Sequence, residues 1–454
     1  MKELTKRETI TIGLMLFALF FGAGNMIFPP ALGQTAGTNV WIAMLGFIIT
    51  GVGLPLLGVV AVGLGGGGLS TLAGRVHPLF GVIFTVIVYL AIGPFLAIPR
   101  TGTVSFEMGV MPFLPESLKG SWVPLFISTL IYFALTYWLS LHPSKLVDRI
   151  GKILTPVLLL IITMMFIQGF IHPIGEIGAP AGAYEATPFF KGFLEGYLTL
   201  DALAAMVFGI VVTAAIKERG IADRKHISMA TVKAGIVAAI GLALVYLALG
   251  YLGATSQVLG ASENGGQILS SVVKQLFGGA GALLLGLAVT LACITTSVGL
   301  VTACSRFFSE RFPAISYRTM AAILCVFSTA VANVGLTQLI SLSVPVLVAI
   351  YPLAIVLMLL SFLHTAFKGY SSVYIGAILA TAAVSLIDGL VQLGLPLDQI
   401  TSLYENLPFY KEGIGWLLPA IAGGLLGYLW ESLRPRRPQP KQAYREKTSS
   451  TPTQ

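Results

Sequence analysis

Charged residues are scarce in this 454-residue chain, where Asp, Glu, Lys and Arg together make up only 10% of the sequence. Soluble domains carry about 25% charged residues, so this deficit excludes an ordinary soluble enzyme or binding module. Hydrophobic residues instead make up 56% of the chain, and its mean hydropathy is +0.88. We therefore expect an all-α integral membrane protein, whose apolar runs cross the lipid bilayer as helices.

Cysteine and histidine are also scarce, with three and five copies. Cys293, Cys304 and Cys325 fall in or beside apolar runs and lack the spacing of a metal site, so we expect them to be small packing residues. The histidines fall in predicted loops or at helix ends, whereas an intramembrane enzyme needs a cluster of such groups within its helices. The sequence therefore argues against an enzyme and predicts no cofactor.

Twelve apolar runs are long enough to cross a bilayer, which takes about 20 residues of helix. They lie near residues 10–31, 40–63, 79–99, 122–141, 150–171, 189–216, 228–253, 277–304, 319–335, 337–363, 371–395 and 413–430. The first run lacks a small-residue cleavage pattern, so we expect it to stay in the mature protein. The predicted architecture is a twelve-helix membrane domain over residues 1–433, followed by a basic tail, 434–454, that we expect to be disordered.

Lys and Arg are distributed unevenly between the two sides of this predicted bundle. With a cytoplasmic N-terminus, all but five of the 27 fall on the cytoplasmic side. The five exceptions are Arg100, Lys119, Lys191, Lys274 and Lys411. Cytoplasmic loops are enriched in positive charge, so both termini are predicted to be cytoplasmic. The net charge of +8 follows from this topology. The basic residues are scattered over short loops, which argues against a nucleic-acid partner.

The first apolar run is interrupted by Gly22, Gly24 and Asn25, and we expect Pro29 and Pro30 to stop it. Lipid offers no hydrogen bonds, so backbone that leaves the helix at membrane depth must be buried in protein or line a solute cavity. The second half of such a helix begins with free N–H groups at the positive end of its dipole, which suits a carboxylate. The alternative is a glycine-rich crossing of two membrane helices.

A second interruption is expected in the sixth run, because secondary transporters often carry inverted repeats whose first helices are both broken. This run contains Asp201 and a small-residue segment that leads to Phe208 and Gly209. The repeats would then comprise helices one to five, about 9–171, and six to ten, about 189–363, with two further helices at about 371–431. An ionisable residue within a span costs about 2.5–3.5 kcal/mol and is usually functional, so we expect Asp201 to face the solute pathway. Alternatively it reaches external water and caps a helix or pairs with Arg100.

The eighth run carries three consecutive hydroxyls, Thr295, Thr296 and Ser297. Hydroxyl oxygens are suitable ligands for a small hard cation. Ser and Thr also bond routinely to carbonyls one turn earlier in membrane helices. The residues alone leave both interpretations open.

Three segments together, LFALFFGAGNMIFPPALG, GYLTLDALAAMVFGIVV and ACITTSVGL, resemble the branched-chain amino acid:cation symporter family, within the amino acid-polyamine-organocation superfamily. The resemblance extends over essentially the whole chain. It implies a leucine-transporter-like fold with a five-plus-five inverted repeat and broken helices one and six. It also implies that leucine, isoleucine and valine are taken up with a cation, usually sodium, across the bacterial inner membrane.

The resemblance also implies roles for particular residues. The break at Gly22, Ala23, Gly24 and Asn25 would hold the substrate carboxylate, mainly on the N–H groups of Ala23 and Gly24, while the Asn25 amide oxygen would face a sodium ion. Phe208 would line the apolar side-chain pocket, and Asp201 would bind the substrate amine or take part in proton coupling. The residues that would form a second sodium site are Ala18, Phe20, Phe21, Ala292, Thr295 and Thr296.

These expectations combine into sodium-coupled symport of branched-chain amino acids by alternating access between two membrane faces. One alternative is proton coupling through Asp201, with the hydroxyls as packing groups. Another is a membrane sensor that binds an amino acid without transporting it, which the short tail argues against. No oligomeric state is predicted.

Overall fold

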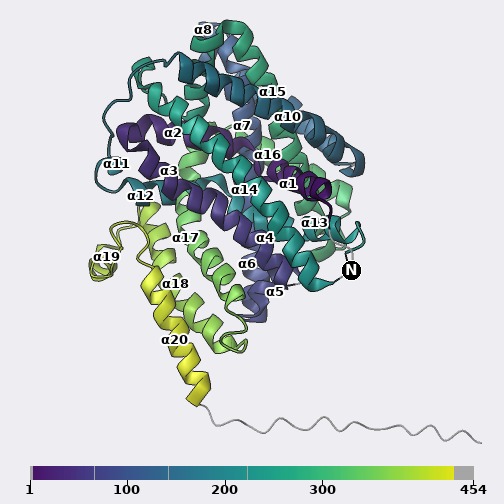
Figure 1. Ribbon diagram of the computed structural model, residues 1–454, viewed down its shortest axis with the longest axis vertical. Coiled ribbons are helices and arrows are strands. Elements are labelled where there is room, and N and C mark those ends of the chain that lie inside the picture. The colour runs from purple at the N-terminus through teal and green to yellow at the C-terminus, as the bar shows by residue number, and fades with distance from the viewer. Residues whose placement is uncertain (1–3, 66, 142, 222, 434–454) are drawn as a thin grey trace, which may run out of the picture.

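The computed structural model describes residues 4–65, 67–141, 143–221 and 223–433, which form helices and no strand. The predicted tail, 434–454, lies outside the described residues. Figure 1 shows the helices packed lengthwise into an elongated bundle, with α18 (Ser371–Gln392) and α20 (Leu417–Leu433) side by side at one end. The all-helical fold class is therefore confirmed.

The first five predicted runs correspond to five helical stretches, three of them interrupted. These are α1 (Lys6–Phe20) with α2 (Ala23–Ala36); α3 (Val40–Ile48), η2 (Ile49–Gly53) and α4 (Leu54–Gly65); α6 (Pro78–Leu90), η3 (Ala91–Phe95) and α7 (Ala97–Gly109); α9 (Trp122–Ser140); and α10 (Pro143–Ile171). A capping box between Thr5 and Glu8 starts α1, because the Thr5 N–H donates to Glu8 Oε2 and the Glu8 N–H donates to Thr5 Oγ1.

The next five runs form the second half of the bundle. They correspond to α12 (Pro188–Glu195), η5 (Gly196–Thr199) and α13 (Asp201–Lys217); α14 (Arg224–Thr255); α15 (Gly265–Arg311); α16 (Tyr317–Ala332); and α17 (Leu336–Phe362). Short elements connect the long helices: η1 (Gly37–Asn39), α5 (Gly68–Gly74), η4 (Met111–Phe113), α8 (Glu116–Lys119), α11 (Ala183–Ala186), η6 (Gln257–Leu259) and α19 (Asp398–Tyr404).

Seven of the described helical stretches are long and apolar enough to cross a membrane, and the bent pair α12–α13 would make an eighth. Three shorter apolar helices, 156–171, 317–332 and 417–433, coincide with predicted runs. The count of twelve spans therefore stays a prediction, although each predicted run overlaps a described helix.

The third predicted run is too short. It was expected to end at residue 99, with Arg100 on the outer side, but α7 continues to Gly109 and the Arg100 side chain is 3% exposed. The outer position of Arg100 is therefore wrong. Hydropathy ended the run at the first charge, whereas the fold buries that charge with partners inside the bundle. The eighth run likewise starts earlier than predicted, at Gly265, with a kink at Gly278 (φ 67°, ψ −161°).

Close helix crossings surround α2. A Cβ atom added at Gly33 would lie 1.9 Å from the carbonyl oxygen of Gly250 on α14, so only glycine allows this approach. The three cysteines are buried and free, in agreement with their expected packing role. The close approach at Gly33 holds α2 against α14, and most residues of α2 are buried, so the first helix break lies inside the bundle.

Candidate functional site

The first helix break lies at Phe21 and Gly22, between α1 and α2. Phe21 (φ −71°, ψ 91°) and Gly22 (φ −129°, ψ −159°) are extended, which confirms a break in this motif. The break is shorter than predicted, because Gly24 and Asn25 already belong to α2, and Pro29 and Pro30 lie inside that helix and do not stop it. The Gly22 N–H donates to the Asn25 side-chain oxygen at 2.9 Å, which stabilises the turn. The last carbonyls of a helix have no N–H donor within that helix, and the first N–H groups of the next helix have no carbonyl acceptor within theirs. The break therefore presents carbonyls from α1 on one side and the N–H groups of Ala23 and Gly24 on the other.

The second break lies at Leu200, where the helical stretch Pro188–Thr199, made of α12 and η5, is bent by 45° relative to α13. Leu200 adopts the left-handed conformation (φ 68°, ψ 1°), which is unusual for a residue with a side chain. Asp201 is the first residue of α13. The segment that leads to Phe208 and Gly209 is helical, so the interruption lies before Asp201 and not in the small-residue segment itself.

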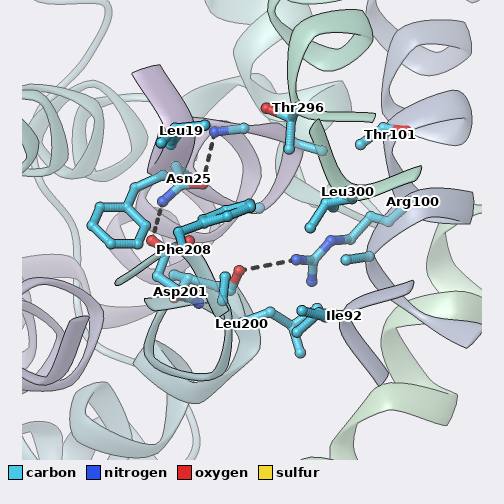
Figure 2. Close-up of a pocket in the computed structure, with 17 residues that line it drawn as sticks. Leu19, Asn25, Ile92, Arg100, Thr101, Leu200, Asp201, Phe208, Thr296 and Leu300 are labelled. Carbon is cyan, nitrogen blue, oxygen red and sulfur yellow. Dashed lines mark hydrogen bonds between the residues drawn. The ribbon is translucent and has the colours of Figure 1, made fainter. Parts of the chain in front are cut away.

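A pocket lies between the two breaks, and the empty space it encloses together with its opening is about 380 Å³. Figure 2 shows the lining side chains, which come from both breaks, from η3 and α7, and from α15. The lining residues are Leu19, Phe20, Gly22, Ala23, Gly24, Asn25, Ile92, Ala97, Arg100, Thr101, Thr199, Leu200, Asp201, Ala204, Phe208, Thr296 and Leu300.

A polar cluster joins the two breaks at one side of this pocket. The Asn25 side-chain amide donates to Asp201 Oδ2 at 2.5 Å and to the hydroxyl of Tyr246 on α14. The Tyr246 hydroxyl also donates to Asp201 Oδ2, at 3.2 Å. Asp201 is 4% exposed and makes no ion pair with Arg100, although both side chains are described. The structure thus places Asp201 in the pocket wall, bonded to neutral groups.

Arg100 extends into the pocket from α7, as Figure 2 shows. Its Nη1 donates to the carbonyl of Leu198 at 2.5 Å and its Nη2 to the carbonyl of Thr199 at 3.1 Å. These carbonyls end η5, where the helix dipole is negative and suits a cation. The guanidinium also lies over the Phe28 ring, 5.2 Å from its centroid. Arg100 is a site residue that the sequence interpretation missed, because a charge directly after an apolar run was assigned to the surface.

The hydroxyls of α15 lie beside the first break. Thr296 lines the pocket, and its buried hydroxyl has no hydrogen-bond partner in the structure. A Cβ atom added at Gly22 would lie 3.0 Å from Thr296 Oγ1, so the two residues are neighbours. The Thr295 hydroxyl instead donates to the carbonyl of Ala292 at 2.7 Å, which is the helix back-bond considered as the alternative. The Ser297 hydroxyl is also buried without a partner but does not line the pocket, so Thr296 alone of the three combines an unpartnered hydroxyl with a place in the pocket wall.

The predicted site residues divide into two groups. Most line the pocket, including Phe20 and Phe208, whose ring centroids are 6.5 Å apart. Ala18, Phe21, Ala292 and Thr295 do not line it and lie at the end of α1 or on α15. The pocket contributors missed by the sequence interpretation include Thr199, Thr101 and Arg100.

The sequence comparison identifies the family of this pocket-bearing chain. A family model described as "Branched-chain amino acid transport protein" matches residues 5–434. The chain belongs to the branched-chain amino acid transport protein family. This membership confirms the family resemblance of the three sequence segments, and with it an integral membrane protein.

Curated members of the branched-chain amino acid transport protein family are similar over nearly their whole length. The chain is 54% identical to the branched-chain amino acid permease BrnQ of Bacillus subtilis, over 95% of this chain and 99% of that protein. It is 48% identical to the branched-chain amino acid transport system 2 carrier protein of Pseudomonas aeruginosa, over 95% and 98%. The relatives are named as permeases and carriers, which confirms a transport protein rather than an enzyme.

Solved structures confirm the fold. The chain is similar to Mhp1, a nucleobase-cation-symport-1 family transporter, in a closed conformation with bromovinylhydantoin bound, with a TM-score of 0.62 and 14% identity over 93% of this chain and 92% of that chain. The inward-facing conformation of Mhp1 gives a TM-score of 0.60 and 15% identity, over 93% and 90%. The family thus has the leucine-transporter-like fold, with its first and sixth helices broken.

Proposed function

We propose that this protein is a sodium-coupled symporter that takes leucine, isoleucine and valine into the cell by alternating access. We place it in the bacterial inner membrane with both termini in the cytoplasm. The observation that carries the proposal is the pocket between two helix breaks, which combines free backbone N–H groups, a buried carboxylate and an apolar wall. The names of the relatives, branched-chain amino acid permeases and carriers, support this choice of substrate.

The substrate is a zwitterion with an aliphatic side chain, and each part has a counterpart in the pocket. The carboxylate would lie at the start of α2, on the N–H groups of Ala23 and Gly24 at the positive end of the helix dipole. The ammonium group would lie toward Asp201. The side chain would contact apolar wall residues such as Phe208 and Leu300. One methylene changes binding by only about 1–3 kcal/mol in such a pocket, so leucine, isoleucine and valine should compete.

The sodium ion would lie on the other side of the first break. The carbonyls from Ala18 to Phe21 lie at the end of α1, so no following helical turn supplies N–H donors to them. Such free carbonyl oxygens are suitable ligands for a hard cation. The unpartnered Thr296 hydroxyl faces the same break and fits this donor set. The Thr295 hydroxyl oxygen could add a ligand, since it uses only its hydrogen in the bond to Ala292.

Coupling follows from the shortness of the break. Only Gly22 separates the last carbonyl that would bind sodium, that of Phe21, from the N–H groups that would bind the carboxylate. A cation that fixes the end of α1 therefore also orients the start of α2, so each ligand stabilises the backbone geometry that the other needs. Sodium entry supplies free energy, since a membrane potential contributes about 2.3 kcal/mol per charge per 100 mV.

Proton coupling through Asp201 is the second candidate. It is favoured by one observation: this buried carboxylate has hydrogen bonds from Asn25 and Tyr246 but no ion pair among the described residues. A carboxylate in that setting can be neutralised by a proton at a modest cost in contacts. In this mechanism the Thr296 hydroxyl would only pack.

Leucine uptake into proteoliposomes separates these mechanisms. An inward sodium gradient at equal pH should drive accumulation, and an inward proton gradient without sodium should not. Uptake that needs the proton gradient and ignores sodium would overturn sodium coupling in favour of Asp201. Failure of the purified protein to bind or exchange leucine under either gradient would overturn the proposed transport function itself.

A further inference from the structure

Arg100 has more hydrogen-bond donors than its protein partners use. A guanidinium carries five N–H donors, and two protein carbonyls, those of Leu198 and Thr199, accept from it. Its Nε is buried and has no hydrogen-bond partner, and the whole side chain is 3% exposed. Leaving donors of a buried cation unpaired is costly, so the pocket side of Arg100 is suited to a ligand that accepts hydrogen bonds.

The guanidinium lies beside the start of α2. A Cβ atom added at Gly24 would be 2.8 Å from Arg100 Nη2 and 3.3 Å from the Phe28 ring. Because glycine stands there, nothing separates the guanidinium from the backbone of the first helical turn. Two sources of positive potential, a fixed cation and a helix N-terminus, therefore converge on one side of the pocket.

We propose that Arg100 binds the substrate carboxylate together with the N–H groups of Ala23 and Gly24. This inference rests on the proposed function, because it assigns a group to that substrate. A guanidinium presents a planar fork that matches a carboxylate, and such charge-assisted contacts are stronger than neutral ones. Figure 2 shows Asp201 and Arg100 in separate parts of the pocket wall, so the two fixed charges match the two ends of a zwitterion.

Arg100 would also connect the substrate to the second broken helix. Its bonds to Leu198 and Thr199 fix the guanidinium at the end of η5, one residue before the Leu200 break. A carboxylate held by Arg100 is therefore tied to the start of α2 and to the end of η5. Both breaks would respond to the same end of the substrate.

Leucinamide provides the decisive probe, because it keeps the ammonium group and side chain of leucine but replaces the carboxylate with a neutral amide. In saturating sodium, wild-type protein should bind leucine more tightly than leucinamide. Arg100→Gln should weaken leucine binding at least about tenfold, the size expected for a lost charged contact, and weaken leucinamide binding less than threefold. Arg100→Lys, which keeps the charge without the fork, should bind leucine with intermediate affinity.

Ser105→Ala is the matched control on the same helix. The Ser105 hydroxyl bonds to Thr290 on α15 and does not line the pocket, so this variant should bind both ligands as the wild type does. Equal losses for leucine and leucinamide in Arg100→Gln would overturn the proposal and leave Arg100 as a link between α7 and η5. Equal binding of the two ligands by wild-type protein would overturn it even if neither variant folds. A wild type that binds no leucine would instead contradict the proposed function.

Discussion

Replacing Thr296 with valine should separate sodium binding from substrate binding. Thr296→Val keeps the branched shape of the side chain and removes a buried hydroxyl that has no partner and lies beside Gly22. If this hydroxyl is a sodium ligand, its loss removes one charge-assisted contact, worth about 1.5–3 kcal/mol. The sodium concentration for half-maximal leucine binding should therefore rise about 10- to 150-fold.

The same substitution should have a different effect on stability. A buried hydroxyl without a partner costs about 1–3 kcal/mol, so without sodium Thr296→Val should unfold at a higher temperature than the wild type. Adding sodium should stabilise the wild type by mass action and should stabilise the variant much less. The difference between the two unfolding temperatures should therefore shrink as sodium is added, and the wild type can become the more stable protein only if sodium binds it.

Sodium titrations of leucine binding and thermal unfolding in choline or sodium chloride measure both effects on purified protein. Ser297→Ala is the matched control, because the Ser297 hydroxyl is also buried and unpartnered but does not line the pocket. Its sodium dependence should equal that of the wild type. An unchanged sodium dependence in Thr296→Val would refute the assignment, and a loss of leucine affinity that persists at saturating sodium would place Thr296 in the substrate site instead.

Three further substitutions test the other parts of the site and its support. Gly24→Leu should abolish leucine binding, because the new side chain would meet Arg100 Nη2 at 2.8 Å, and retained affinity in a folded variant would show that the break is only a helix crossing. Asp201→Asn should weaken leucine binding at least about tenfold at neutral pH by removing the partner of the ammonium charge, and an unchanged dissociation constant would contradict that role. Gly265→Ala should reduce the yield and thermal midpoint of folded protein, because its Cβ would lie 1.7 Å from a carbonyl oxygen of α2. Gly299→Ala is the control on the same helix, because a Cβ atom there meets open space. This variant should keep the wild-type yield and thermal midpoint, and size-exclusion profiles would report the yield of folded protein.

The first helix break could be predicted from the sequence because its cause is local. Glycines at 22 and 24 and a side chain at Asn25 that accepts the Gly22 N–H lie within one short segment, whereas Pro29 and Pro30 lie inside α2 and do not end it. Local backbone preferences decide where such a helix stops. The long apolar helices followed in the same way from hydropathy, since the bilayer selects runs of about 20 apolar residues.

A break in the sixth run was predicted, but its position at Leu200 and the inward position of Arg100 could not be, because their causes are tertiary. Leu200 carries no local signal for the left-handed conformation that it adopts. Arg100 follows an apolar run, and hydropathy assigns such a charge to the surface, whereas carbonyls of Leu198 and Thr199 from a distant helix accept its hydrogen bonds. The Tyr246 bond to Asp201 likewise joins residues from different helices.

The arrangement of fixed charges accounts for why a zwitterion suits this pocket better than a neutral aliphatic molecule. Arg100 and Asp201 are both buried but form no ion pair, so their mutual attraction offsets only part of the desolvation cost of each. An amino acid brings the complementary pair of charges and offsets both costs at once. An aliphatic molecule without charges would gain only the apolar contacts with residues such as Phe208. Selection for the backbone of an amino acid therefore comes from the two polar parts of the wall, and the apolar part only discriminates among side chains.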